Sequence, residues 1–177
     1  MCPPDIYGRG SGPGNTQSVF VQLFVRDVLR SDAARRRAFY YRDGTNARSW
    51  VHVKDLVALY LRLVEAAAEK KVGVPWNAEG YYFAGTQEHS QMDVAVGVGR
   101  VLKKMGRIAE EEPVEVGLEA MDGMAKHPQF PSLGRYLYAS NSRTRAERAR
   151  EVFGWEGKEK GLMECLEDDV EEALTGL

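Results

Sequence analysis

Cysteine and histidine are scarce in this chain of 177 residues. It contains two cysteines, Cys2 and Cys165, near its opposite ends, and three histidines spread along the sequence. A zinc site needs several such ligands at short spacings, and a redox pair usually takes the form Cys-x-x-Cys. Neither pattern occurs, so we expect two unpaired thiols and neither a metal nor a redox centre.

Long apolar runs are also missing. No segment approaches the ~20 apolar residues that span a bilayer, and the N-terminus lacks the basic and apolar segments of a secretory signal. The composition, 44% hydrophobic and 28% charged, is typical of a single globular domain. We therefore expect a cytoplasmic protein without a membrane partner.

Charge is unevenly distributed, although the net charge is only -2. Residues 26–48 are rich in arginine and residues 156–172 are rich in acids. A basic stretch can bind nucleic acid, but this one lacks regularly interleaved aromatic residues and matches no groove-reading motif. A solvated helix face, with one arginine available for an anionic ligand, is the favoured interpretation. No nucleic-acid partner is expected.

Hydrophobic periodicity predicts helices at residues 15–30, 54–70, 90–105 and 162–174. Ser90 and Asp93 have the spacing of a capping box, although the alternating valines that follow leave a strand as the alternative. Ser140–Ser142 offers N-caps for a further helix that ends near Gly154. Strands are predicted at residues 38–41, 50–53 and 81–84. The helix at 54–70 is expected to bury Leu56, Tyr60, Leu63, Val64 and Ala67.

Three motifs together resemble one family. Residues 3–8 read Pro-Pro-Asp-Ile-Tyr-Gly, residues 48–56 read Arg-x-x-Val-His-Val-x-Asp-Leu, and residues 141–155 contain Asn-Ser-Arg-x-Arg-Ala followed by Phe-Gly-Trp. The combination is similar to the C-terminal part of the extended short-chain dehydrogenases/reductases, the NAD(P)-dependent epimerase/dehydratase family. The second and third motifs are the distinctive ones, and the resemblance runs nearly end to end.

The resemblance implies an α/β fold. It predicts an α+β lobe that combines the C-terminal strands of a Rossmann-type sheet with the substrate-binding lobe, in a single partial domain. Residues 1–60 would form the end of the sheet and linking elements, and residues 61–177 a mostly helical substrate lobe. In the family, the dinucleotide-binding glycines and the catalytic Tyr-x-x-x-Lys pair precede the strand that matches the start of this chain. The N-terminal dinucleotide-binding half is therefore expected to be absent.

Neither of those two motifs occurs in the sequence. The glycines of residues 8–14 are spaced by two throughout, which does not fit G-x-G-x-x-G, the turn that brings a pyrophosphate to a helix N-terminus. None of the eight tyrosines is followed by a lysine four residues later. We therefore assign no catalytic residue, and NAD(P), which the family implies, is not expected to bind this chain alone.

The resemblance assigns two groups of residues to binding. Pro3, Asp5 and Ile6 match the family's segment along the nicotinamide, although a strand end with a stiff turn is an equally good explanation. Tyr7 and Arg48 are assigned to the substrate, because in sugar-nucleotide epimerases an arginine at the place of Arg48 binds phosphate. A surface salt bridge is the alternative for Arg48.

Two further residues of the second motif are expected to be structural. His52 is expected to pack beside the start of the following helix, and Asp55 is expected to stabilise the N-terminus of that helix. Neither is assigned a part in binding or catalysis.

Three functions remain open. The first is the substrate-binding C-terminal portion of an NAD(P)-dependent oxidoreductase or epimerase-like protein, inactive alone and specific for a carbonyl, hydroxyl or sugar-like small molecule. The second is a non-catalytic binding or regulatory protein that pairs with a full-length relative, or with itself, through an open sheet edge and apolar helix faces. The third is an independent enzyme that uses Asp5, Tyr7 and His52, which requires those groups within ~3 Å of the transferred proton.

Overall fold

The computed structural model describes residues 1–31 and 36–176, so residues 32–35 of the arginine-rich stretch lie outside the described residues. The strands are β1 (Asp5–Tyr7), β2 (Phe39–Tyr40), β3 (Ala47–His52), β4 (Gln87–Ser90) and β5 (Val114–Glu115). The helices are α1 (Val19–Arg30), α2 (Val53–Ala68), α3 (Gln91–Lys104), α4 (Leu118–Asp122), α5 (Leu133–Ala139), α6 (Glu147–Phe153) and α7 (Leu162–Thr175), and a 3-10 turn, η2, lies at Asn77–Glu79. The fold is mixed α/β, as the sequence predicts.

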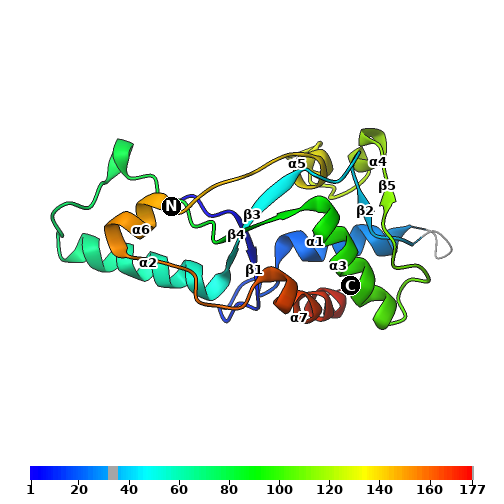
Figure 1. Cartoon of the computed structure of the whole chain (residues 1–177), viewed down its shortest axis with the longest axis horizontal. Coiled ribbons are helices and arrows are strands. Elements are labelled where there is room, and N and C mark those ends of the chain that lie inside the picture. The colour runs from blue at the N-terminus through cyan, green and yellow to red at the C-terminus, as the bar shows by residue number, and fades with distance from the viewer. Residues whose placement is uncertain (32–35, 177) are drawn as a thin grey trace.

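The central sheet has the strand order β1-β3-β4 (Figure 1). β1 is parallel to β3, with Asp5 opposite Trp50 and Tyr7 opposite His52, and β4 is antiparallel to β3. β2 and β5 form a separate parallel pair. β1 is thus an edge strand of its sheet, and its C-terminal end leads into the glycine-rich segment before α1.

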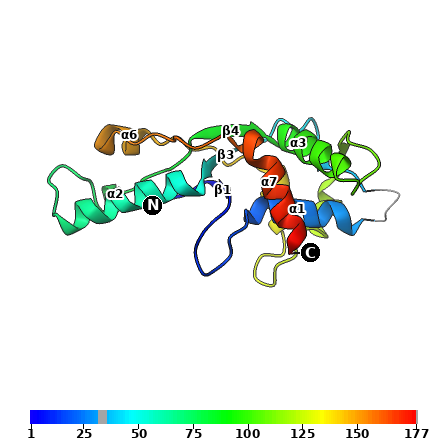
Figure 2. The same cartoon turned by 90° about the horizontal axis from the view of Figure 1, so that it is seen from below.

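Strand β3 separates two hydrophobic cores. Trp50 is fully buried in the larger core, which α1, α3 and α7 line, whereas Val51 is fully buried in the smaller core with α2 and α6. Successive side chains of a strand point to opposite faces, so β3 contributes to both cores. Figure 1 shows α2 and α6 on one side of the central strands and α1, α3 and α7 on the other. Figure 2 shows α7 crossing beside α1, with which it packs.

Local signals in the sequence correctly locate several elements. The Ser90 hydroxyl accepts the Asp93 N–H at 3.0 Å and the Asp93 carboxylate accepts the Ser90 N–H at 2.9 Å, so the predicted capping box opens α3 and the helix prevails over the alternative strand. Gly154 ends α6 at φ +56°, a left-handed conformation that glycine adopts without strain. Trp155 then packs into the smaller core beside α6, as predicted.

The strand predicted at residues 81–84 is wrong. In this segment only Phe83 pairs, through a single bridge to Cys2, and the third strand of the sheet is the polar segment Gln87–Ser90. Tyr82 and Ala84 are buried in the smaller core. The apolar signal at 81–84 therefore reflects core packing rather than strand pairing.

The helix predicted from Ser140–Ser142 is also wrong in its start, because α6 begins at Glu147 without a side-chain cap. The polar residues bind the backbone of β3 instead. Asn141 Oδ1 accepts the Ala47 N–H at 2.9 Å, and the Ser142 carbonyl accepts the Ser49 N–H at 2.9 Å. A backbone partner distant in sequence thus replaces the local cap.

The apolar face of α2 is only partly buried. Leu56 and Leu63 lie in the smaller core as predicted, but Tyr60, Val64 and Ala67 do not, and Leu59 and Ala66 take their place. Tyr60 is 43% exposed and Val64 is 63% exposed, and they form an open stripe with Val57 and Leu61. We call these four residues the α2 stripe. The spacing of the α2 stripe is typical of a helix face that packs against another element, but none of the described residues covers it.

None of the helices in the described ranges has the length and apolarity needed to cross a bilayer. Within the same residues, no three His, Cys, Asp or Glu side chains gather as a metal site.

Candidate functional site

A cavity of about 460 Å³ lies where β1 runs into the glycine-rich segment and α1 begins. We call it the β1 cavity. It is lined by Pro4, Asp5, Ile6, Gly8, Gly10, residues 15–20, Val53 and Leu137. Ser18 fixes one wall, because its hydroxyl donates to the Ile6 carbonyl at 2.8 Å and accepts the Val21 N–H as the N-cap of α1. The cavity therefore combines a strand end with the N-terminus of a helix, a place where ligands commonly bind.

Asp5 is the charged residue of the β1 cavity, and it is paired with Arg48. Arg48 Nε donates to Asp5 Oδ2 at 2.5 Å and Nη2 donates to Oδ1 at 3.4 Å. Nη1 donates to the Tyr136 carbonyl at 3.0 Å and to the Ser140 hydroxyl at 3.3 Å. Burial disfavours the charged guanidinium and is the largest single effect, but the hydrogen bond and the charge of Asp5, together with Tyr136, outweigh it and raise the pKa of Arg48. Arg48 is 4% exposed and lies behind Asp5 rather than in the cavity lining.

Tyr7 lies in neither cavity lining, and its side chain is buried in the larger core. Its hydroxyl donates to the Lys160 carbonyl at 2.7 Å and accepts from Gln87 Nε2 at 2.5 Å. Burial raises the pKa of Tyr7 above its ordinary value of 10.0, with Cys165 and Asp55 as weaker causes in the same direction. The hydroxyl is thus a neutral structural link between β1, β4 and the segment before α7.

Gly8 separates the β1 cavity from a second cavity of about 570 Å³. Its N–H donates to both carboxylate oxygens of Asp169 on α7, each at 3.1 Å. Gly8 has φ +81°, and a Cβ there would lie 2.3 Å from His52 Nε2, so only glycine fits. Burial raises the pKa of Asp169 from 3.8 to about 6, while the Gly8 N–H opposes the shift.

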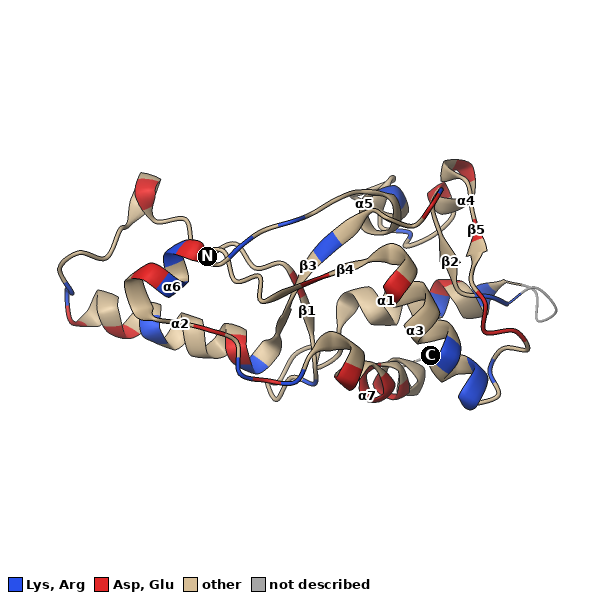
Figure 3. Ribbon diagram, in the orientation of Figure 1, with Lys and Arg blue, Asp and Glu red and all other residues tan. Residues whose placement is uncertain are grey.

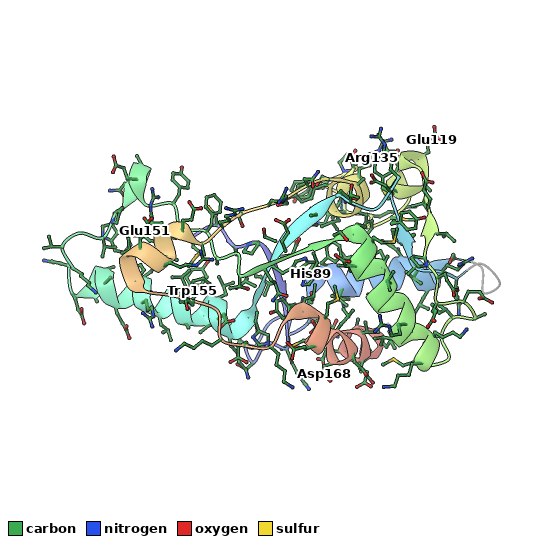
Figure 4. All side chains as sticks on the ribbon, in the orientation of Figure 1. His89, Glu119, Arg135, Glu151, Trp155 and Asp168 are labelled. Carbon is green, nitrogen blue, oxygen red and sulfur yellow. The ribbon has the colours of Figure 1, made fainter. Side chains whose placement is uncertain are left out.

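The second cavity is rich in charge. Its lining includes Arg9, Lys54, Glu159, Lys160, Asp168, Glu171 and Glu172. Figure 3 shows the acidic positions along α7, and Figure 4 shows Asp168 at the outer surface of that helix. Most of these charges face solvent, which is typical of a solvated helix face.

His52 packs at the start of α2, as predicted, whereas the Asp55 carboxylate, in the first turn of that helix, binds a distant segment instead of the helix N-terminus. His52 Nδ1 accepts the Lys54 N–H at 3.2 Å as the N-cap of α2, and its ring meets the Tyr7 ring edge-on at 5.2 Å. Burial lowers the pKa of His52. Asp55 accepts the N–H groups of Lys158 and Glu159 at 2.9 and 3.3 Å. Each is committed to a backbone partner.

The residues predicted for binding therefore do not gather in one site. Asp5 and Ile6 line the β1 cavity, whereas Pro3 is exposed outside it, Tyr7 is buried beneath it and Arg48 holds Asp5 from behind. For Arg48, the sequence left phosphate binding and a surface salt bridge open, and the structure contains a salt bridge that is buried. Asp5, Tyr7 and His52, the residues of a hypothetical independent enzyme, each bond to a different partner.

Sequence reasoning missed the other contributors to the cavity. The wall from α1 comes from Ser18, Val19 and Phe20, and Leu137 arrives from α5. Asp169, which anchors Gly8, lies 161 residues away along the chain. Only the N-cap pattern of Ser18 gave a local signal, because the other contacts depend on tertiary packing.

Residues 1–78 match the sequence model described as the NAD dependent epimerase/dehydratase family. This segment contains the whole lining of the β1 cavity except Leu137. The predicted family resemblance is confirmed. No curated protein sequence matches the chain.

Solved structures share the fold over nearly the whole chain. A dTDP-glucose 4,6-dehydratase from Bacillus anthracis in complex with NAD is 17% identical, with a TM-score of 0.52 over 98% of this chain and 43% of its own. A UDP-glucose 4-epimerase from Thermotoga maritima with UDP-glucose is 18% identical, with a TM-score of 0.52 over 98% and 45%. The RMD protein from Pseudomonas aeruginosa complexed with NADPH is 15% identical, with a TM-score of 0.54 over 99% and 47%. The chain therefore spans less than half the length of these structures.

Proposed function

We propose that this chain provides the substrate-binding portion of an NAD(P)-dependent oxidoreductase or epimerase-like protein and has no catalytic activity alone. The substrate class is a small molecule with carbonyl, hydroxyl or sugar-like groups. The observation that carries the proposal is the position of the β1 cavity, which is built almost entirely from the segment that matches the family model. The sequence contains no Tyr-x-x-x-Lys pair to supply the acid of the reaction.

NAD(P), the family's cofactor, fits these residues only in part. The apolar side chains of Ile6, Phe20 and Leu137 suit a flat ring such as nicotinamide. The pyrophosphate needs a glycine turn at a helix N-terminus or a cation. Among the described lining residues Asp5 is the only charged one, and it is negative. The whole dinucleotide therefore does not fit the β1 cavity, which supports the proposal that the chain does not bind it alone.

We expect the purified chain to bind neither NADH nor NADPH appreciably and to reduce no carbonyl compound. The reason is that the sequence contains neither the G-x-G-x-x-G turn that binds the pyrophosphate nor the Tyr-x-x-x-Lys pair that supplies the acid. Isothermal titration calorimetry with each cofactor measures the first effect, and absorbance of the reduced nicotinamide measures the second.

An intact relative assayed in the same buffer is the control for that experiment. A micromolar dissociation constant for NADPH with this chain alone would contradict the proposal. Turnover that appears when the dinucleotide-binding half of a relative is added would support it, because the two halves would then share one active site.

A second candidate function is a non-catalytic protein that pairs with a full-length relative or with itself. The α2 stripe and the edge position of β1 favour it. Val57, Leu61 and Val64 are each at least 50% exposed and lie on one face of a 16-residue helix. Exposed apolar faces of this kind usually mark a protein interface.

We expect the wild-type chain alone to self-associate or to bind a hydrophobic dye, and Leu61→Lys with Val64→Lys to reduce both effects. Two charges on the α2 stripe oppose its burial, and loss of an apolar contact of this size weakens association by about tenfold or more. Light scattering and dye fluorescence measure the change. The matched control is Phe130→Lys, since Phe130 is 58% exposed but lies outside α2.

A monodisperse wild-type monomer without dye binding would contradict that expectation. Stoichiometric capture of a full-length relative by the wild-type chain, but not by the double variant, would favour the pairing function over the substrate-binding one.

A further inference from the structure

Asp169 is a buried carboxylate that lines the second cavity and has no counter-charge. It is 5% exposed, and its carboxylate oxygens each accept the Gly8 N–H at 3.1 Å. The charged groups that act on it are the carboxylates of Asp168 and Glu172, and no basic side chain among the described residues pairs with it. An ionised carboxylate accepts about four hydrogen bonds, so Asp169 keeps free acceptor positions. A cation bound there would offset the cost of burying the charge.

His52 supplies a free donor to the same cavity. It is 6% exposed, and its Nδ1 accepts the Lys54 N–H, so the proton of the neutral ring lies on Nε2. Nε2 has no hydrogen-bond partner among the described residues. Gly8 contacts both side chains, because its N–H donates to Asp169 and a Cβ on it would meet His52 Nε2. A buried acceptor and a buried donor are therefore separated by a single glycine.

The remaining charges of the second cavity favour a cationic ligand. Five acidic and three basic side chains line it, and two of the basic ones are already paired, Arg9 with Glu172 and Lys54 with Glu159. A metal ion needs several ligands in one place, and no such group occurs in the part of the chain that the structure describes. The described lining contains no Phe, Tyr or Trp ring that could form a cage for a quaternary ammonium. A primary ammonium, which donates three hydrogen bonds, suits the free carboxylate positions.

We propose that the second cavity binds a small primary ammonium compound with a hydroxyl group beside its nitrogen. The ammonium donates to the Asp169 carboxylate, and the hydroxyl oxygen accepts the His52 Nε2–H. The proposal concerns a cavity other than the β1 cavity, so it goes beyond the proposed substrate-binding function and does not depend on it.

The test titrates the isotopically labelled wild-type chain with ethanolamine, n-propylamine and ethylene glycol in separate experiments at pH 7.5. The compounds are nearly isosteric, but propylamine lacks the hydroxyl oxygen and ethylene glycol lacks the charge. Sodium chloride keeps the ionic strength constant, because screening changes the environment of all exposed charges. The Gly8 and Lys54 amides are the reporters, since they donate to Asp169 and His52. The Phe20 amide, which belongs to the β1 cavity alone, is the internal control.

We expect ethanolamine to shift both reporter amides saturably and to leave the Phe20 amide unchanged. It should bind about tenfold or more tightly than ethylene glycol, because a charge-assisted hydrogen bond replaces a neutral one. It should bind about threefold more tightly than n-propylamine, because only its hydroxyl oxygen accepts the His52 N–H. The absence of a saturable shift with ethanolamine overturns the proposal, as does equal or tighter binding of either analogue.

The variant Asp169→Asn removes the charge that holds the ammonium but keeps the size of the side chain and an oxygen for the Gly8 N–H. We expect it to weaken ethanolamine binding by about tenfold or more. Asp168→Asn is the matched control, because Asp168 is the exposed neighbour on α7 and lines the same cavity (Figure 4). A folded Asp169→Asn chain that binds ethanolamine as tightly as wild type overturns the proposal, and so does an equal loss in Asp168→Asn, since general surface charge would then explain the binding.

The ligand series in the wild-type chain decides the question by itself if Asp169→Asn does not fold. None of these titrations contains a nicotinamide cofactor, a carbonyl compound or a second polypeptide. They can therefore fail while the restored-turnover experiment succeeds, or succeed while it fails, so the two proposals are tested separately.

Discussion

Replacing Arg48 by alanine is expected to lower the free energy of unfolding by about 3–5 kcal/mol, the usual cost of removing one partner of a buried ion pair. The truncation leaves the Asp5 carboxylate without its two guanidinium bonds. It also removes the bonds to the Tyr136 carbonyl and the Ser140 hydroxyl, which join β3 to the end of α5. Urea unfolding followed by circular dichroism measures the loss.

Arg135→Ala is the control, since Arg135 also pairs with an aspartate in a two-bond arrangement, but at the surface. We expect a much smaller effect there, because exposed pairs contribute little to stability. The combined variant Asp5→Asn and Arg48→Met should recover part of the loss, since it removes both charges together. An Arg48→Ala chain as stable as Arg135→Ala would show that the pair is not buried in solution.

The elements predictable from sequence are those with a complete local signal. α3 follows from the Ser90–Asp93 capping box and the helical period of its valines, and the end of α6 follows from Gly154. α2 was located correctly, but its face was not. Its apolar residues fill more than one face, so periodicity alone could not determine that Leu59 is buried and Val64 exposed.

The errors share one physical cause. At residues 81–84 and at Ser140–Ser142, a local preference competed with a partner distant in sequence, and the distant partner prevailed. Tyr82 fills a core, and Ser142 pairs with the backbone of β3. The polar strand β4 had no local signal at all, because its antiparallel pairing with β3 determines its conformation.

Only one wall of the candidate site, the one formed by β1, could be predicted from the sequence. Pro3, Asp5, Ile6 and Tyr7 were assigned by resemblance, and two of these four residues, Asp5 and Ile6, line the β1 cavity. The Asp5–Arg48 pair spans 43 residues and the Gly8–Asp169 contact spans 161. Contacts at such separations leave no spacing pattern in a single sequence, so the charge balance of the cavity emerged only from the fold.

Replacing Asp169 by asparagine is expected to raise the free energy of unfolding relative to wild type, and to raise it more at pH 7 than at pH 4. The variant and the wild type are compared at the same pH. Burial raises the pKa of this carboxyl from 3.8 to about 6, so the folded state binds its proton more tightly than the unfolded state does. Stability from this group is therefore highest below pH 4 and falls as the pH rises toward 6. The full change in the free energy of unfolding is about 3 kcal/mol at most, and it levels off about one pH unit above the folded-state pKa.

Asparagine stays neutral at every pH, while its side-chain oxygen can still accept the Gly8 N–H. The difference between variant and wild type thus reports mainly on Asp169, because titrating groups that do not interact with it contribute equally to both chains. Asp168→Asn is the control, since Asp168 is the exposed neighbour on the same helix. Urea unfolding at pH 4, 5, 6 and 7 gives the curve. A difference that does not grow between pH 4 and pH 6, or that grows equally for Asp168→Asn, would mean that Asp169 is not held in a desolvated position against Gly8, and the wall between the two cavities would then be more open than the structure indicates.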